Sequence, residues 1–319
     1  MRRREVLAAL AMAPCLAQAQ PGYPDRPVKV IIPFPPGGPS DVQGRLVCLK
    51  LQERLGQPFV VENRSGASGN ISTRAAATAP ADGYTLLVMT PAQVINVFLS
   101  ANAGYDLARD FAPISLLSVA PAVLLAHPSL QARNYNELVA RLRERTTPIA
   151  FGSAGAGLST HLMMEMVRKR AGLEMLHVPY RGSAPALQAL AAGEVMLLMD
   201  SMVSGMALAR AGHAVPLAVT SAGRSQVAPD VPTLAESGLP GFDAVTWYGL
   251  MAPRATPAPV LQRLAQETAA VLQDADTAQR LRGMGSEPAR SDPESFGRFL
   301  QQEAAQWAEL ARASGARIE

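Results

Sequence analysis

A turn rich in proline and glycine near the start of the chain has the composition of a small-anion site. Val30–Ile32 is a short run of branched apolar residues, typical of a buried strand, and Pro33–Asp41 follows it directly. Gly37 and Gly38 have no Cβ, so the main chain can turn sharply and a ligand can approach it closely. A helix that begins after such a turn directs unpaired N–H groups and the positive end of its dipole at one point. The pattern indicates a site for a carboxylate, although an ordinary strand-to-helix connection has the same composition.

The helix after this turn is expected to run to about Leu55 and to stop at Gly56. We expect Ser40 to cap its first turn, with Gln43 three residues later completing a capping box. A phosphate loop is excluded, because neither Gly-x-x-x-x-Gly-Lys-Ser/Thr nor Gly-x-Gly-x-x-Gly follows the strand.

A second glycine-rich turn, Gly152–Gly157, also leads into a predicted helix. Its glycine order is reversed relative to the dinucleotide fingerprint, so a second anion-binding turn is the better interpretation. The hydroxyls of Ser153, Ser159 and Thr160 would add hydrogen-bond donors there. His161 could donate to an anion, but a packed or helix-capping histidine fits the same pattern.

Polar residues at other predicted strand and helix ends could complete a site. Asp41 and Asp200 are the candidates for acid–base work, with helix capping and a solvated strand end as their alternatives. Tyr180 suits a cleft wall or the core. Arg181 could pair with a ligand carboxylate or lie in solvent.

Most catalytic and metal-binding patterns are absent from the sequence. It has no Gly-x-Ser-x-Gly elbow, no His-x-x-x-His pair and no Cys/His cluster. We therefore expect no metal and no cofactor. Cys48 is the only cysteine outside the N-terminal segment and cannot form an internal disulfide.

Residues 1–19 are typical of a secretion signal. Arg2–Arg4 gives a basic start, Val6–Leu16 is apolar, and Ala17–Ala19 is a small-x-small cleavage site. Arg3 and Arg4 also suggest twin-arginine export. Without this segment, 26 basic and 25 acidic residues remain, which argues against nucleic acid binding. No later stretch is long and apolar enough to span a bilayer, so we expect an exported, periplasmic protein.

Strands and helices alternate along the chain, which predicts doubly wound, mostly parallel sheets. Thr90 and Gln93 lie just beyond the predicted strand Tyr84–Met89, at the sheet edge where ligands bind in such folds. Phe111–His127 is too long for one regular strand, so we interpret it as crossing between two lobes. A second alternating series follows, and Val245–Ala252 could cross back. The predicted division is 20–122 with 249–319 in the first lobe, and 123–248 in the second.

Seven segments, in this order along the chain, carry a family resemblance. They are Pro33–Asp41, Val61–Ile71, Asp82–Leu87, Gly152–Gly157, His177–Ala186, Pro229–Gly238 and Trp247–Leu250. Over about Tyr23–Pro253 the sequence resembles the receptors of tripartite tricarboxylate transporters, also called the Bug family.

This resemblance implies a two-lobed, type II periplasmic-binding-protein fold with a cleft between α/β lobes. It implies that main-chain groups and hydroxyls of the two turns hold a ligand carboxylate, often with water. On one side of the cleft it places Phe34, Gly37, Gly38 and Asp41. On the other side it places Ser153, Gly157, Ser159, Thr160 and His161, with Tyr180, Gly182 and Asp200 near the mouth.

The sequence departs from the family pattern at four positions. Gln93 stands where many relatives have His, and Val97 where many have Pro. Ser201 replaces a common Asn, and Met196 a common Asp. These positions leave the identity of the ligand open.

We therefore expect a monomeric receptor that captures a small carboxylate by lobe closure, with membrane transporter subunits as partners. One alternative is a sensor subunit that reports to a sensor kinase. Another is an enzyme on the same scaffold that uses Asp41, His161 and Asp200 as acid–base groups.

Overall fold

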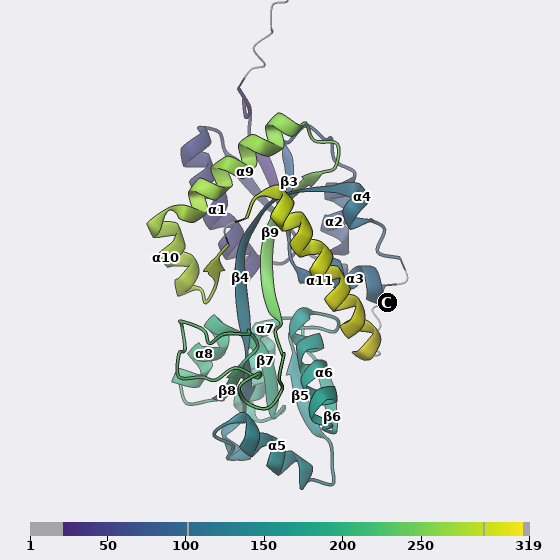
Figure 1. The fold of residues 1–319 in the computed structure, drawn as a ribbon, viewed down its shortest axis with the longest axis vertical. Helices are drawn as coiled ribbons and strands as arrows, with labels where there is room; N and C mark the ends of the chain where they lie inside the picture. The colour runs from purple at the N-terminus through teal and green to yellow at the C-terminus, as the bar shows by residue number, and fades with distance from the viewer. Residues whose placement is uncertain (1–21, 101, 290, 315–319) are drawn as a thin grey trace, which may run out of the picture.

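The computed structural model describes residues 22–100, 102–289 and 291–314. The predicted signal segment, residues 1–19, lies outside them. The molecule is elongated, with two α/β lobes stacked along its long axis and joined by two long strands (Figure 1).

The first lobe is built on a parallel β-α-β-α-β series. β1 (Val28–Ile32) lies between β2 (Phe59–Asn63) and β3 (Thr85–Met89), parallel to both. The helical segments of this series are α1 (Pro39–Leu55), the 3₁₀ turn η1 (Ala67–Gly69), α2 (Asn70–Ala77) and α3 (Pro91–Leu99). β1 is thus the strand at which the strand order reverses, and ligands bind beyond the carboxyl end of such strands.

The second lobe repeats this arrangement. β5 (Ile149–Ser153) lies between β6 (Met175–Pro179) and β7 (Leu197–Ser201), again parallel to both. α6 (Ser159–Ala171) and α7 (Ser183–Ala192) connect them. The remaining elements are η2 (Pro128–Leu130), α5 (Tyr135–Arg143), α8 (Met202–Arg210) and β8 (Val215–Val219). The turn after β5 is therefore the counterpart of the turn after β1.

Two antiparallel strands cross between the lobes. β4 (Phe111–Ala126) follows the short helix α4 (Leu107–Asp110) and pairs with β9 (Val245–Pro253) as far as Pro121. From Ala122 onward β4 pairs with β7 instead.

The segment Phe111–His127, expected to be too long for one regular strand, forms β4, a single strand of 16 residues that is irregular. Its ladder with β9 shifts register twice, between Pro113 and Ser115 and between Leu116 and Ser118. Such irregularities are where a strand tolerates proline. The lobe limits at 122/123 and 248/249 stay predictions.

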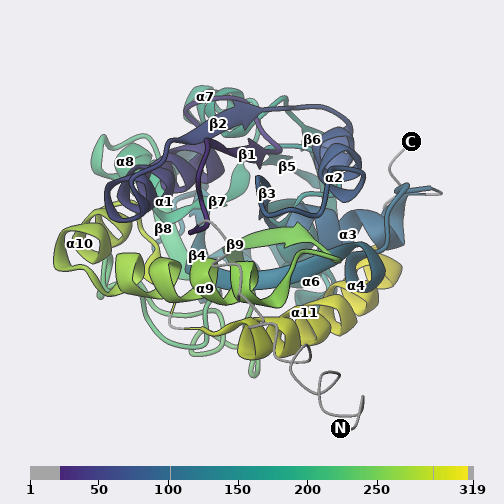
Figure 2. The same ribbon diagram turned by 90° about the horizontal axis from the view of Figure 1, so that it is seen from above.

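The C-terminal segment returns to the first lobe and then runs along the crossing strands (Figures 1 and 2). It contains α9 (Ala258–Gln273), α10 (Ala275–Gly283), β10 (Glu287–Pro288) and α11 (Pro293–Ser314). α11 packs on β4, on α3 of the first lobe and on α6 of the second. One buried apolar cluster includes residues of both lobes and of α11.

The expected capping box at the start of α1 is wrong. The N-cap is Gly38, and Pro39 is the first helical residue. Gln43 points into the interior, where its Nε2 donates to Ser286 and its Oε1 accepts from Ser118. A capping box does form at α3, between Thr90 and Gln93. In both helices proline occupies the first helical position, where its missing N–H costs nothing.

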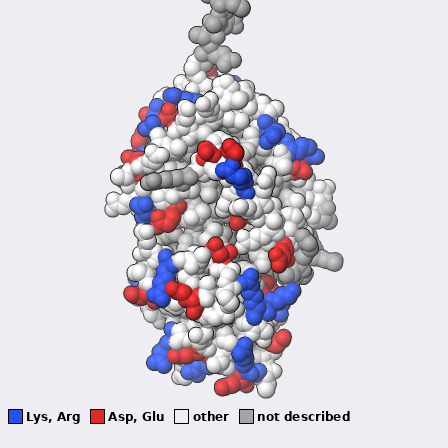
Figure 3. All heavy atoms as spheres, in the orientation of Figure 1, with Lys and Arg blue, Asp and Glu red and all other residues white. Residues whose placement is uncertain are grey.

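No helix within the described ranges is long and apolar enough to cross a membrane. On the face shown in Figure 3, basic and acidic side chains are interspersed. That face offers no broad basic surface for a polyanion.

Candidate functional site

The first glycine turn is closed by the helix that follows it. The N–H of Gly37 donates to Oδ2 of Asp41, 2.9 Å away and four residues on. Gly37 has a φ of +81°, which is costly for any residue with a Cβ. The turn therefore depends on glycine, and the Gly37 N–H is already bonded rather than free for a ligand.

Asp41 is a buried anion held by its neighbours. Its Oδ1 accepts from Nε of Arg45 at 2.9 Å and from Nδ2 of Asn63 at 2.8 Å. Burial acts to raise the pKa of Asp41, but these hydrogen bonds and that from Gly37 outweigh it and lower the pKa below its usual value. Asp41 therefore closes the helix start and places a negative charge beside the first turn.

The second glycine turn has the same construction. The N–H of Gly157 donates to Nδ1 of His161 at 3.0 Å, again four residues on, and Gly157 has a φ of +75°. Asp41 and His161 each occupy the third position of their helix. In both lobes, the glycine just before the N-cap thus donates to the side chain at the third helical position.

His161 is a neutral imidazole within an aromatic stack. It lies against His177 with ring centroids 3.7 Å apart, and Nε2 of His177 is 2.6 Å from Oγ of Ser153. Burial and the neighbouring His177 lower the pKa of His161 to about 3, and burial lowers that of His177 to about 4. Because its Nδ1 accepts from Gly157, His161 carries its proton on Nε2.

The two turns therefore differ in charge and in available donors. An ionised carboxylate lies beside the first turn and a neutral ring beside the second. α1 begins with Pro39, which has no N–H, whereas α6 begins with Ser159 and Thr160, both half-buried. The first N–H groups of a helix have no partner within it. The start of α6 thus offers more unpaired donors than the start of α1.

Both helices are anchored near their starts to the crossing strands. Gln43 of α1 bonds to Ser118 of β4. Oγ of Ser159, the first residue of α6, lies 3.2 Å from Oγ1 of Thr246 on β9. Thr246 pairs with Ala120, two residues from Ser118. The starts of α1 and α6 are therefore fixed to one short stretch of the ribbon that joins the lobes.

The segment around Tyr180 lies along the second turn. The N–H of Tyr180 donates to the carbonyl of Ser153, and that of Gly182 to the carbonyl of Ala154, each at 2.9 Å. Gly182, with a φ of +115°, is the N-cap of α7, and the Tyr180 side chain is half-buried.

Asp200 supports this segment from β7. It is buried and accepts from the Ser183 hydroxyl and from the N–H of Ser201, the latter at 2.7 Å. Burial raises the pKa of Asp200 to about 6 in spite of these hydrogen bonds. It is therefore a buried anchor for the start of α7 rather than a solvated strand end.

Thr90 and Gln93 are buried, and their side chains bond to each other. Oε1 of Gln93 accepts from both the N–H and the hydroxyl of Thr90. This fixes the amide orientation and leaves Nε2 as a buried donor without a hydrogen-bond partner among the described residues. A Cβ on Gly69 would lie 2.5 Å from this Nε2. Gln93 therefore fills the space beside Gly69, and Phe34 of the first turn is half-buried.

Sequence reasoning missed three residues of this arrangement. Asn63 pairs with Ile32 at the end of β1, which the parallel strand order could have indicated. His177 and Thr246 could not be found in this way, because both reach the second turn through contacts between distant segments. Within the described parts of the chain, no hydrogen bond or ion pair joins Asp41, His161 and Asp200 to one another.

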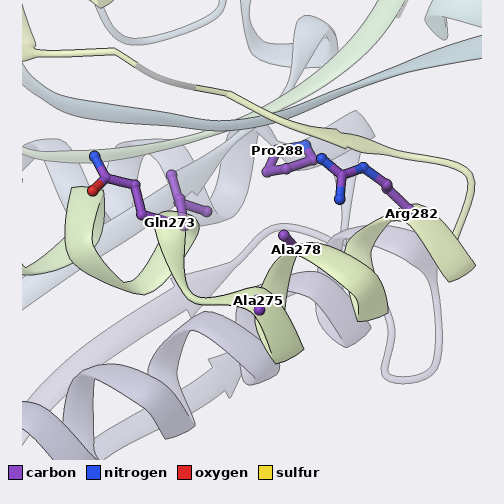
Figure 4. Close-up of a pocket in the computed structure, with 6 residues that line it drawn as sticks. Gln273, Ala275, Ala278, Arg282 and Pro288 are labelled. Atoms are coloured by element: carbon purple, nitrogen blue, oxygen red, sulfur yellow. The ribbon is translucent and has the colours of Figure 1, made fainter.

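The described residues contain no group of three or more His, Cys, Asp or Glu that could hold a metal ion. A pocket elsewhere lies between the end of α9, α10 and β10 (Figure 4). It is lined by Leu272, Gln273, Ala275, Ala278, Arg282 and Pro288. None of the predicted site residues contributes to it.

Comparison with known proteins identifies the family. Residues 44–316 match the tripartite tricarboxylate transporter family receptor. The "UPF0065 protein in tcbD-tcbE intergenic region" of Pseudomonas sp. strain P51 is 38% identical over 313 residues, covering 97% of this chain and 93% of that protein.

Solved structures agree with this match. "R. palustris Rpa4515 with adipate" is 36% identical with a TM-score of 0.86, covering 92% of this chain and 99% of that one. "MatC (Rpa3494) from Rhodopseudomonas palustris with bound malate" is 32% identical with a TM-score of 0.81, covering 91% and 100%. The two-lobed architecture is thus that of a known group of proteins, and this chain belongs to the tripartite tricarboxylate transporter receptor family.

Proposed function

We propose that this chain is a periplasmic receptor that captures a small carboxylate between its two lobes and passes it to a tripartite tricarboxylate-type transporter. The family match and the two structural relatives named with adipate and malate support a carboxylate ligand. The observation that carries the proposal is the anchoring of both turn-bearing helices to one stretch of the β4–β9 ribbon.

The ligand carboxylate binds at the second turn. The N–H groups of Ser159 and Thr160 lie at the positive end of α6, and their hydroxyls can add two donors. The side chain that closes this turn, His161, is a neutral imidazole, and the Glu165 carboxylate 3.9 Å from its Nε2 is paired with Arg168. At the first turn an incoming carboxylate would meet the ionised carboxylate of Asp41, which is paired with Arg45 at 2.9 Å.

The first turn closes over the rest of the ligand. Phe34 and Gly38 are half-buried and Gly37 is exposed, so this face presents an aromatic ring and bare backbone, while the Asp41 carboxylate that bonds to Gly37 is buried. A ligand that bridges both turns binds the closed arrangement of the lobes better and so favours it. Selectivity then comes from how Phe34 and the space in front of Gln93 accommodate the ligand beyond its carboxylate.

Capture and release without chemical change is the activity that we propose, since Asp41, His161 and Asp200 each serve a separate internal network. Residues 1–19 direct export to the periplasm and are removed. The protein then acts as a monomer, with its lobes divided near 122/123 and 248/249.

Thermal-shift screening of the protein lacking residues 1–19 tests this proposal. Adipate, malate, aromatic monocarboxylates and amino acids form the panel, with matched amides as controls. We expect at least one carboxylate, and not its amide, to raise the melting temperature, with calorimetry then giving one site per chain and mass spectrometry an unchanged ligand. No shift across the panel, or turnover of the ligand, would contradict the proposal.

A further inference from the structure

The helix α11 carries a row of buried residues from Phe296 to Ala311. α11 has 22 residues and is about 33 Å long at 1.5 Å per residue. Phe296, Glu303, Trp307 and Ala311 are all buried, and their spacing of seven, four and four places them on one side of the helix. This face is apolar except for Glu303.

Glu303 joins α11 to the crossing strand β9. A single carboxylate oxygen, Oε2, accepts from Nε1 of Trp247 at 2.5 Å and from Nε1 of Trp307 at 2.6 Å. The indoles are fully buried, and the two residues are the only tryptophans in the sequence. A buried carboxylate is costly unless its lone pairs are satisfied, so the two indole N–H groups hold Glu303 in this position.

The hydrogen bonds of Glu303 with the two tryptophans lie where the chain passes from one lobe to the other. Trp247 pairs with Val119, and β4 changes its partner three residues later. Gln306, on the next turn of α11, donates through Nε2 to the carbonyl of Asp243 at 2.8 Å, just before β9 begins. α11 therefore bonds to the start of β9 and to the residues just before it from two successive helical turns.

A second contact fixes the other half of the helix. A Cβ on Gly249 would lie 2.1 Å from Cζ of Phe296, so the ring of α11 rests directly on the β9 backbone. α11 then continues between α3 of the first lobe and α6 of the second (Figure 1). If α11 moves with β9, rotation of the second lobe requires α6 to slide along the end of α11.

We propose that α11 is a strap across the hinge, fastened to β9 through Trp247, Glu303 and Trp307, which limits how far the second lobe can rotate away from the first. This role concerns the range of opening and is separate from the recognition of a carboxylate. Neither glycine turn contributes a residue to it.

Three substitutions distinguish the effect of the Glu303–tryptophan hydrogen bonds from that of the general packing of α11. Glu303→Gln keeps a carbonyl oxygen that can accept from both indoles and serves as the matched control. Trp307→Phe keeps an aromatic ring in the same space but removes one donor. Glu303→Leu removes the acceptor.

Small-angle scattering of the ligand-free proteins and hydrogen exchange provide the readouts. We expect a larger radius of gyration for Trp307→Phe and Glu303→Leu than for the wild type and Glu303→Gln. In the same two variants, exchange becomes about tenfold faster or more in α11 and in the facing part of α6, while β1 and β5 keep their protection.

Unchanged scattering and exchange in Trp307→Phe would overturn the proposal. So would faster exchange spread evenly over the whole chain, because that result describes general destabilisation. If Glu303→Leu does not fold, Trp307→Phe decides the question alone. All measurements are made without ligand, so their outcome is independent of the proposed carboxylate binding.

Discussion

The N–H of Gly157 donates to Nδ1 of His161, 3.0 Å away, and so holds the imidazole with its proton on Nε2. The first lobe makes the same bond from Gly37, but to a carboxylate, that of Asp41. The same backbone hydrogen bond thus occurs in both lobes, but its acceptor is an ionised carboxylate in the first and a neutral imidazole in the second. This contrast is the reason for proposing a carboxylate site at the start of α6.

Gly37→Leu is expected to weaken carboxylate binding while leaving the fold intact. Gly37 is exposed and nothing lies within 4 Å of a Cβ placed on it, so the side chain would project from the turn. The left-handed backbone costs roughly 1–2 kcal/mol in stability. Calorimetry would show at least tenfold weaker binding.

Gly56→Leu is the matched control, because Gly56 ends the same helix with a φ of +70° and equally open surroundings. It should lower the melting temperature by a similar amount and bind normally. Equal affinities in the two variants would remove the first turn from the site.

Stability should fall as the pH drops below about 6.5. The folded protein keeps His161 and His177 neutral, with pKa values of about 3 and 4, whereas in the unfolded chain they take up protons near 6.5. Each then lowers the free energy of unfolding by about 1.4 kcal/mol per pH unit. Asp200 acts in the opposite direction between about pH 6 and pH 4, because its folded pKa is raised to about 6.

Urea titrations from pH 7 to pH 4 measure this slope. His177→Gln should flatten it, and Asp200→Asn should make it steeper. A wild-type slope in His177→Gln would contradict the assignment of the stacked histidines as neutral groups.

Gly249→Ala should destabilise the protein by about 1–3 kcal/mol, since the new methyl group would overlap the ring of Phe296. Phe296→Leu should partly relieve this cost. In a double-mutant cycle by urea unfolding, the two changes should couple by about 1 kcal/mol. Additive effects would show that the ring does not rest on this part of β9.

Local patterns in the sequence predicted most of the elements around the site. Val30–Ile32 and the helix ending at Leu55 form as expected, because a short branched run and a C-terminal glycine are local signals. The Ser40 cap failed because Pro39 takes the first helical position, which makes Gly38 the N-cap. The preference of proline for the first helical position could therefore have predicted this N-cap from the sequence.

Other features depend on tertiary contacts that no local pattern shows. The N–H groups of Gly37 and Gly157 donate to the side chain at the third position of the following helix. No local sequence pattern shows that this side chain folds back onto the turn. β4 is one strand whose register with β9 shifts near Pro113 and whose partner changes after Pro121. Likewise, the buried state of Thr90 and Gln93 follows from the packing of α3.

The most direct test of the central claim is the affinity of His161→Asn and His161→Asp for the carboxylate that passes the thermal-shift screen. Both side chains can accept from the Gly157 N–H, as Asp41 accepts from Gly37, and they differ in charge. We predict that calorimetry gives near wild-type binding for His161→Asn. For His161→Asp we predict a loss of about 2 kcal/mol or more, from like-charge repulsion in a partly buried site. Equal affinities in the two variants would contradict a carboxylate at the start of α6.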